Sequence, residues 1–309
     1  MSIADENLLQ IVAGNTAAIL VTRIRAVLEQ ITLDEETEGG VVEVEVLREV
    51  TREKWHGPSN KVPLGFSRST SRAVRIRSGM QGFNGVELTP GNLVLVALLD
   101  IPESERGQPL TSPLSPLSVA PLGAPDDPLV RGVEKALAIQ PDKPEPVRLR
   151  LVREALDGTL PFLVEYGHYA AGRLGRIPRR AAVAMELELF EDESRSPRDR
   201  AMAEATLELE LWREDEPEDP ENRKIVEAFF RQLGTADKEL RLHVVEALHA
   251  MLDPDAAPGS EEAQRSEALM KGVKIPKGPK LRAAMGAIAG DPSTSAHAPW
   301  LYRVIAKNP

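Results

Sequence analysis

The chain has 309 residues, a formal net charge of −10 and no cysteine. This length is enough for two domains of ordinary size. The absence of cysteine excludes disulfide scaffolds, thiolate metal sites and cysteine nucleophiles, and the acidic balance disfavours unaided binding to nucleic acid or to anionic membranes.

The N-terminal residues MSIADENLLQ show no basic region followed by an apolar run. No apolar run in the chain approaches the roughly 20 residues of a membrane span. We therefore expect a cytoplasmic protein without a membrane span.

The first third of the chain is predicted to form a short helix followed by strands. The helix is expected over 3–13, where Ser2 and Asp5 suit a capping box. Val42, Val44 and Val46 alternate with glutamates, which is the period of a half-buried strand. By the same reasoning, runs of β-branched and apolar residues predict strands at 17–28, 41–50, 73–77, 93–99 and 117–122.

The run FNGVELTPGNLVLVALL places a Pro-Gly turn ahead of a buried strand. Together with the long opening strand and the alternating strand after it, this order resembles the small OB-like barrels of netrin and metalloprotease-inhibitor modules. The resemblance covers roughly residues 15–125 and implies a small antiparallel β-barrel. The cysteines of the extracellular inhibitors are absent, so their protease-blocking function is not implied.

Residues 101–128 are rich in Pro, Ser and Gly, a composition typical of a loop or linker. Asp127-Pro128 then suits a helix start. We therefore predict an α+β protein with a β-barrel-like domain over 1–125 and an α-helical repeat domain over 126–309.

The second part of the chain is expected to be helical to its end. Prolines fall where first turns belong, and glycines fall near helix ends. The predicted helices are 128–139, 146–157, 160–173, 178–191, 197–213, 222–233, 238–252, 260–271, 279–289 and 298–306. Successive helices are expected to pair as hairpins over 146–173, 178–213, 222–252 and 260–289, the period of an α-solenoid.

The pair IVEAFFRQLGTADKELRLHVVEALHAML, residues 225–252, resembles a HEAT repeat. It has an apolar first helix, a short loop with Asp237, a basic residue entering the second helix, and Val-x-Ala-Leu within that helix. The resemblance implies a HEAT-like solenoid for the C-terminal domain.

Two Glu-x-x-His pairs, Glu165 with His168 and Glu246 with His249, have the spacing of half of a ferritin-like di-iron site. A helical wheel for 238–252 places Leu240, Val244, Ala247, Leu248 and Met251 on one face. Glu246 and His249 lie on the opposite, polar side. We therefore expect both pairs to lie on solvated helix faces and predict no metal site.

A basic run near the predicted barrel is the one candidate ligand site in the sequence. On an OB-like barrel, arginines interleaved with aromatic rings can neutralise phosphates and stack on the bases of a single strand. The alternative is an exposed strand face whose arginines offset the acidic charge. The candidate residues are Arg68, Arg72, Arg75, Arg77, Trp55 and Phe66.

Signatures of catalysis are missing from the sequence. It contains no Gly-rich phosphate loop, no His-Glu-x-x-His and no Gly-x-Ser-x-Gly, and its five histidines are scattered without evident partners. We therefore predict no catalytic or cofactor-binding residues, although a site assembled in space from distant residues stays open.

Because solenoids act mainly through extended surfaces, we expect a non-enzymatic adaptor or scaffold that binds a protein partner. The alternative is a single-stranded nucleic-acid-binding protein that uses the basic face of the barrel. Neither the identity of the partner nor the oligomeric state follows from the sequence.

Overall fold

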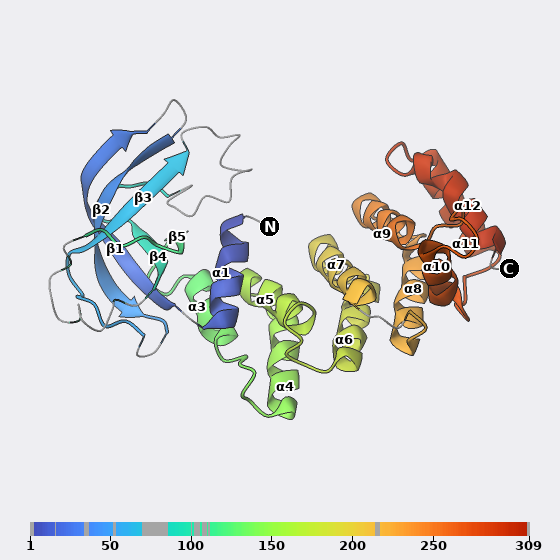
Figure 1. Cartoon of the computed structure of the whole chain (residues 1–309), viewed down its shortest axis with the longest axis horizontal. Coiled ribbons are helices and arrows are strands. Elements are labelled where there is room, and N and C mark those ends of the chain that lie inside the picture. Colours follow the sequence, from blue (N-terminus) through green and yellow to red (C-terminus); the bar gives the residue numbers. More distant parts are fainter. Residues whose placement is uncertain are drawn as a thin grey trace. The chain divides into compact units, whose positions relative to one another are not determined.

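A computed structural model describes residues 3–15, 17–33, 37–51, 54–69, 86–99, 101, 106, 110, 112–213 and 217–307. The chain divides into two compact units, 1–167 and 168–309 (Figure 1). The first unit holds an antiparallel sheet and the helices next to it in sequence, and the second is helical. The protein is therefore of the α+β class.

The first unit begins with helix α1 (Ile3–Gly14) and continues with five strands. These are β1 (Ala18–Thr32), β2 (Thr37–Glu49), β3 (Val62–Ser69), β4 (Leu93–Leu98) and β5 (Ser118–Leu122). They form one sheet in the order β3-β2-β1-β4-β5, and all neighbours pair antiparallel. The predicted strands at 17–28, 41–50, 93–99 and 117–122 are confirmed.

Alternation along β2 positions the core of the sheet. Val42 and Val44 are fully buried, and they pack with residues of the other strands such as Leu64, Val94 and Val96. Glu43 and Glu45, which alternate with these valines, point to the other face of the sheet. There the Glu45 carboxylate lies 3.1 Å from the Arg25 guanidinium. The alternation of valine and glutamate along β2 therefore determines which face of the sheet carries the buried core.

The sheet is not closed into a barrel by a continuous ladder. One parallel bridge joins Leu64 of the edge strand β3 to Leu114, which precedes the other edge strand, β5. Its two hydrogen bonds run from the Gly65 N–H to the Leu114 oxygen and from the Leu114 N–H to the Pro63 oxygen, each 2.9 Å. Among the described residues, the edge strand β3 is thus bonded to the segment that leads into β5, and not to β5 itself.

Strand β3 was not among the predicted strands. Its residues, VPLGFSRS, include Pro63 and Gly65, which are unfavourable in strand interiors. Proline is tolerated here because, among the described strands, β3 lies at the edge of the sheet and pairs with β2 alone. The strand predicted at 73–77 lies outside the described residues.

Three helices follow the sheet: α3 (Pro128–Ala136), α4 (Glu145–Leu156) and α5 (Pro161–Ala171). Arg48 on β2 forms an ion pair of 2.8 Å with Glu134 on α3, so the first of these helices is tied to the sheet. The two compact units meet between residues 167 and 168. The domain boundary predicted at 125/126 coincides instead with the change from strands to helices. Whether the chain has independent domains on the two sides of 125/126 stays a prediction.

The second unit is built from helices; its α-helices were predicted to within three residues at each end, whereas its 3₁₀ helix was not predicted. They are α6 (Arg179–Glu191), α7 (Pro197–Arg213), α8 (Pro220–Gln232), α9 (Lys238–Met251), α10 (Glu261–Met270), α11 (Pro279–Gly290), the 3₁₀ helix η2 (Ser295–His297) and α12 (Ala298–Lys307). Caps explain several starts. Asp219, Asp237 and Ser260 each accept a hydrogen bond from a backbone N–H in the first turn of the helix that follows.

The helices of this unit pack in a repeating manner. Helix α6 contacts α7, and α8 contacts α9; in addition, α6 contacts α8 and α7 contacts α9. Farther along, α10 packs on α8, while α11 packs against η2 and α12. The expected hairpins 178–213 and 222–252 are therefore present, whereas the last hairpin is formed by α11 and α12 instead of by 260–289.

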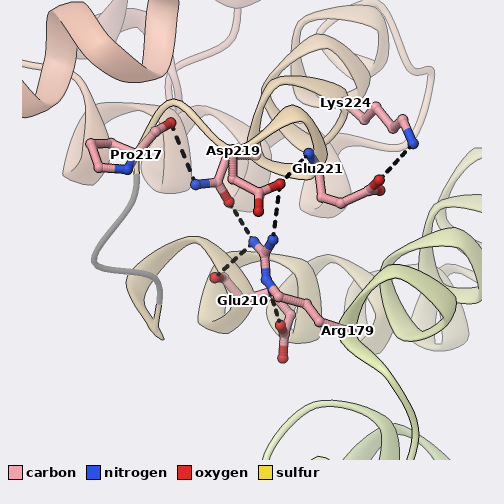
Figure 2. A network of polar contacts seen from close by, with 7 residues as sticks. Arg179, Glu210, Pro217, Asp219, Glu221 and Lys224 are labelled. Atoms are coloured by element: carbon pink, nitrogen blue, oxygen red, sulfur yellow. Dashed lines mark hydrogen bonds and ion pairs between the residues drawn. The ribbon is translucent and has the colours of Figure 1, made fainter.

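A polar network joins the start of α6, the end of α7 and the start of α8 (Figure 2). Arg179 donates to the Asn222 side-chain oxygen at 2.5 Å, and its guanidinium lies 3.2 Å from the Glu210 carboxylate and 3.3 Å from Asp219. Asp219 also caps α8 by accepting the Glu221 N–H at 2.6 Å. One arginine thereby fixes two consecutive hairpins to each other.

Two further buried arginines occupy the same position, the fourth residue, of α7 and α9. Arg200 donates to the Phe190 carbonyl at the end of α6 and to Gln232 at the end of α8. Arg241 donates to the Thr235 carbonyl, just after α8, and to the Asp291 carboxylate, just after α11. Each arginine therefore links its own hairpin to the next one.

Candidate binding pocket

A pocket of about 580 Å³ lies in the second unit, within the size range of ligand sites. Its walls come from the ends of α7 and α9, the loop after α9, the start of α10, η2 and the start of α12. We call it the Trp212 pocket. Its aromatic and charged lining residues are Trp212, His249, Asp253, Asp255, Glu262, Arg265, Trp300 and Arg303.

Trp212, at the end of α7, forms one aromatic wall of the pocket, and 47% of its surface is accessible. Its indole N–H donates to Glu208 at 3.4 Å. The guanidinium carbon of Arg265 lies 4.8 Å from the centre of the ring and completes a cation–π contact. Arg265 also donates to the Leu211 carbonyl at 2.9 Å, so its position is fixed from two sides.

Trp300 and His249 form the second aromatic wall, and His297, which is not part of the lining, contacts His249. Trp300 is buried, and its indole N–H donates to the Leu252 carbonyl at 3.0 Å. The His249 ring lies 4.5 Å from the Trp300 ring, centre to centre, and its Nδ1 lies 3.0 Å from the Nδ1 of His297. This short contact requires one nitrogen to donate a proton and the other to accept it.

The surroundings of His249 lower the pKa of its imidazole. Desolvation is the main cause, followed by the charge of His297; Asp253 opposes them and Arg303 adds to them. His249 is therefore held neutral at pH 7, which matches the donor and acceptor arrangement with His297.

The carboxylates of the lining differ in whether they form an ion pair. Arg303 donates to Asp255 at 2.7 Å and thereby neutralises it. Among the described residues, Asp253 and Glu262 form no ion pair with any cation; Asp253 accepts only the backbone N–H of Asp255, at 2.8 Å. The lining therefore presents two carboxylates without a counter-ion.

A second pocket of about 380 Å³ adjoins the first, and Asp253 belongs to both linings. Its walls include Pro254, Ala263, Met270 and Val304, so it is more apolar in character than its neighbour. Lys307, also in its lining, donates its ammonium protons to the Pro254 carbonyl. The two pockets meet at the start of the loop between α9 and α10.

The residues predicted to bind nucleic acid differ in their burial and in whether the structure describes them. Phe66 is only 6% exposed and belongs to the core of the sheet, so it offers no free ring face to a base. Trp55 packs partly buried against the same core and donates to the Pro58 carbonyl at 3.3 Å. Arg68 lies on β3. The side chain of Arg68 and the whole of Arg72, Arg75 and Arg77 fall outside the described part of the chain.

The two Glu-x-x-His pairs differ from each other. Glu246 and His249 are exposed as predicted, opposite the buried face of α9. The prediction of a solvated face is wrong for Glu165 and His168, which are 7% and 5% exposed. Their helix is buried on nearly all sides, so a wheel with one polar face does not apply to it.

The partner of His168 is Glu186 on α6, with 2.7 Å between His168 Nδ1 and the carboxylate. Burial is the main cause that raises the pKa of Glu186, and the nearby His168 opposes it. Across the described residues, no cluster of three or more His, Asp or Glu side chains is arranged to hold a metal ion. The pair joins α5 to α6 inside the protein.

Another buried carboxylate, Glu204, lies between α7 and α9. Its side chain is 4% exposed, and the imidazole Nδ1 of His243 lies 4.0 Å from its carboxylate, beyond hydrogen-bonding distance. Desolvation, followed by the charges of Glu208 and Glu246, raises the pKa of Glu204 to about 8. This carboxyl group is therefore largely protonated at neutral pH.

The sequence did not predict that the residues of the Trp212 pocket lie together. They are spread over four α-helices, the 3₁₀ helix η2 and one loop, and no short motif contains more than a few of them. The histidines described as lacking partners do have them in space: His249 with His297, and His168 with Glu186.

Comparisons with known proteins add no family assignment, because no family model matches the chain and neither a curated protein nor a solved structure shows significant similarity. No helix in the described part of the chain is long and apolar enough to cross a membrane.

Proposed function

We propose that the protein is a non-enzymatic adaptor that binds another protein through a HEAT-like helical repeat. The observation that carries this proposal is the packing of the second unit, in which α6 contacts α8 and α7 contacts α9. Contacts between equivalent helices of successive hairpins are the defining feature of a solenoid, and solenoids present extended binding surfaces.

The buried arginines support the repeat. Arg200 and Arg241 stand at the same position of α7 and α9 and are roughly 40 residues apart, the period of a HEAT-like hairpin. Both link the end of the first helix of their own hairpin to the next hairpin. Such repeated contacts are expected when neighbouring units share one structural plan.

The Trp212 pocket supports a binding role for this unit. Tryptophan and arginine are enriched among the residues that contribute most to protein–protein affinity. Here an exposed Trp212 lies beside Arg265, in a pocket between helix ends. The arrangement suits recognition of a partner better than proton transfer, because among the described residues Arg303 is paired with Asp255 and the hydrogen-bond partner of His249 is His297, outside the lining.

The N-terminal unit is proposed to be an OB-like module. The bridge between Leu64 of β3 and Leu114, in the segment leading into β5, supports this proposal, because a small barrel brings its first and last strands together. Single-stranded nucleic-acid binding by this module is the alternative function. It rests on the arginine run of the sequence, which lies mostly outside the described residues.

The test is affinity capture from native lysate with the full chain, quantified by mass spectrometry. We compare the wild type with Trp212→Ala and with Tyr302→Ala, a control that removes an exposed aromatic residue outside the pocket. A protein enriched by the wild type and by Tyr302→Ala, but lost with Trp212→Ala, is the expected result. Enrichment of no protein, together with salt-sensitive retention on single-stranded DNA, would favour the alternative.

A further inference from the structure

We propose that the Trp212 pocket receives a positively charged Arg or Lys side chain from an extended basic segment of the partner protein. This inference rests on the proposed adaptor function and names the chemistry of the segment that it binds.

The balance of charge favours a cation. The lining carries three carboxylates, Asp253, Asp255 and Glu262, against the two guanidiniums of Arg265 and Arg303, so one negative charge is in excess. Arg303 is paired with Asp255. The guanidinium of Arg265 is held by the Trp212 ring and the Leu211 carbonyl, and among the described residues neither Asp253 nor Glu262 forms an ion pair with it. The carboxylate of Glu208, bonded to the Trp212 indole, adds to the negative field at that wall. An arriving cation gains from this field, whereas an anion is repelled by it.

The aromatic wall suits the same side chains. Almost half of the surface of Trp212 is free, although Arg265 already covers part of the ring. Arg and Lys carry long apolar stems that pack on such surfaces while their charged ends stay near carboxylates. The contact between Arg265 and Trp212 shows that this ring accepts a guanidinium within the protein itself.

The neighbouring pocket indicates that the bound segment is extended. The two pockets share Asp253, and the smaller one is lined by the apolar side chains of Pro254, Ala263, Met270 and Val304. An extended chain advances about 3.3 Å per residue and points alternate side chains in opposite directions. A basic residue in the larger pocket therefore fits with an apolar residue a few positions away in the smaller one.

The experiment uses the full chain and the indole N–H signals of its three tryptophans in ¹⁵N-correlated NMR spectra. The probes are N-acetyl-arginine methylamide and, as the anionic counterpart, N-acetyl-glutamate methylamide. We expect the arginine probe to shift the Trp212 signal along a saturating curve. The Trp55 signal, which comes from the other unit, should stay in place.

Two variants sharpen the test. Glu262→Gln should weaken binding of the arginine probe about two- to fivefold, the range of one solvent-accessible ion pair. Glu261→Gln is the matched control, because Glu261 is exposed, adjacent in sequence and absent from the lining. It should leave the affinity unchanged.

The inference is overturned if the arginine probe does not move the Trp212 signal, or if the glutamate probe moves it equally. It is overturned as well if Glu261→Gln and Glu262→Gln weaken binding alike. These outcomes can be distinguished from a failure of the proposed function. If the wild type still captures a partner, the adaptor function is retained and only the proposal of a basic bound segment is refuted. A saturable, arginine-selective shift in a protein that captures no partner would keep the pocket chemistry and refute the adaptor.

Discussion

Replacing Glu204 by glutamine should stabilise the protein increasingly as the pH rises. Glu204 is buried between α7 and α9 without a hydrogen-bonding cation, and its pKa is raised from 4.5 to about 8. A raised pKa means that the folded state binds the proton more tightly than the unfolded state does. The stabilising contribution of the protonated carboxyl is therefore complete below pH 4.5 and is lost progressively as the pH rises to about 8.

The size of the effect follows from the two pKa values. Each pH unit between them corresponds to about 1.4 kcal/mol, so the full difference from 4.5 to about 8 is worth about 5 kcal/mol. Most of it, about 4 kcal/mol, is lost between pH 5 and pH 8.5. Glutamine resembles the protonated acid in shape and does not ionise. The free energy of unfolding of Glu204→Gln relative to wild type should therefore grow by about this amount over that pH range.

The assay is urea denaturation at several pH values between 5 and 9, followed by circular dichroism. Glu267→Gln is the control, because Glu267 is an exposed carboxylate on α10. Its stability relative to wild type should not change with pH. A difference between Glu204→Gln and wild type that is independent of pH, or a variant less stable than wild type at pH 8.5, would refute the reasoning.

Three further predictions concern the helical unit. Leu248→Ala should cost about 2–5 kcal/mol and lower the melting temperature by several degrees, whereas His249→Ala, at an exposed position, should cost much less; thermal melts decide. Arg241→Ala should lower the melting temperature far more than Arg231→Ala, because Arg241 is buried with Asp291 and Arg231 forms a surface pair; equal effects would contradict the role of Arg241. His297→Ala should raise the pKa of His249 in an NMR titration, because the charge of His297 helps to lower it; an unchanged or lower value would count against their contact.

The helix ends followed from the sequence because local chemistry determines them. Asp237 and Ser260 cap the helices that follow them, and Pro197 and Pro279 stand in first turns. The buried stripe of α9 was predictable for a related reason. This helix has one face in contact with its neighbours and one face in solvent, so its apolar residues repeat with the helical period.

Features that depend on long-range packing were not predictable in this way. Strand β3 contains Pro63 and Gly65, and only its edge position in the sheet permits them. His168 is buried because its helix is covered on nearly all sides, and its partner Glu186 lies on another helix. The single bridge at Leu114 likewise depends on how the sheet curls.

The candidate pocket was the least predictable feature. Trp212, His249, Arg265 and Trp300 come from four different helices and converge only because those helices pack together. Each residue alone reads as an ordinary surface or core position. The sequence predicted a binding role from the repeat pattern, but not the pocket that we propose as the binding site.

The most direct test of the account is site-specific photo-crosslinking from the wall of the pocket. Ala250 is exposed and lines the Trp212 pocket, so Ala250→p-benzoylphenylalanine places the reactive group at the proposed binding site; Tyr302→p-benzoylphenylalanine places it on α12 outside the pocket. We predict that irradiation in cells links position 250 to a discrete protein partner, through a segment containing Arg or Lys, and that position 302 gives little of this product. Equal crosslinking from both positions, or none from position 250, would contradict the claim that this pocket binds the partner.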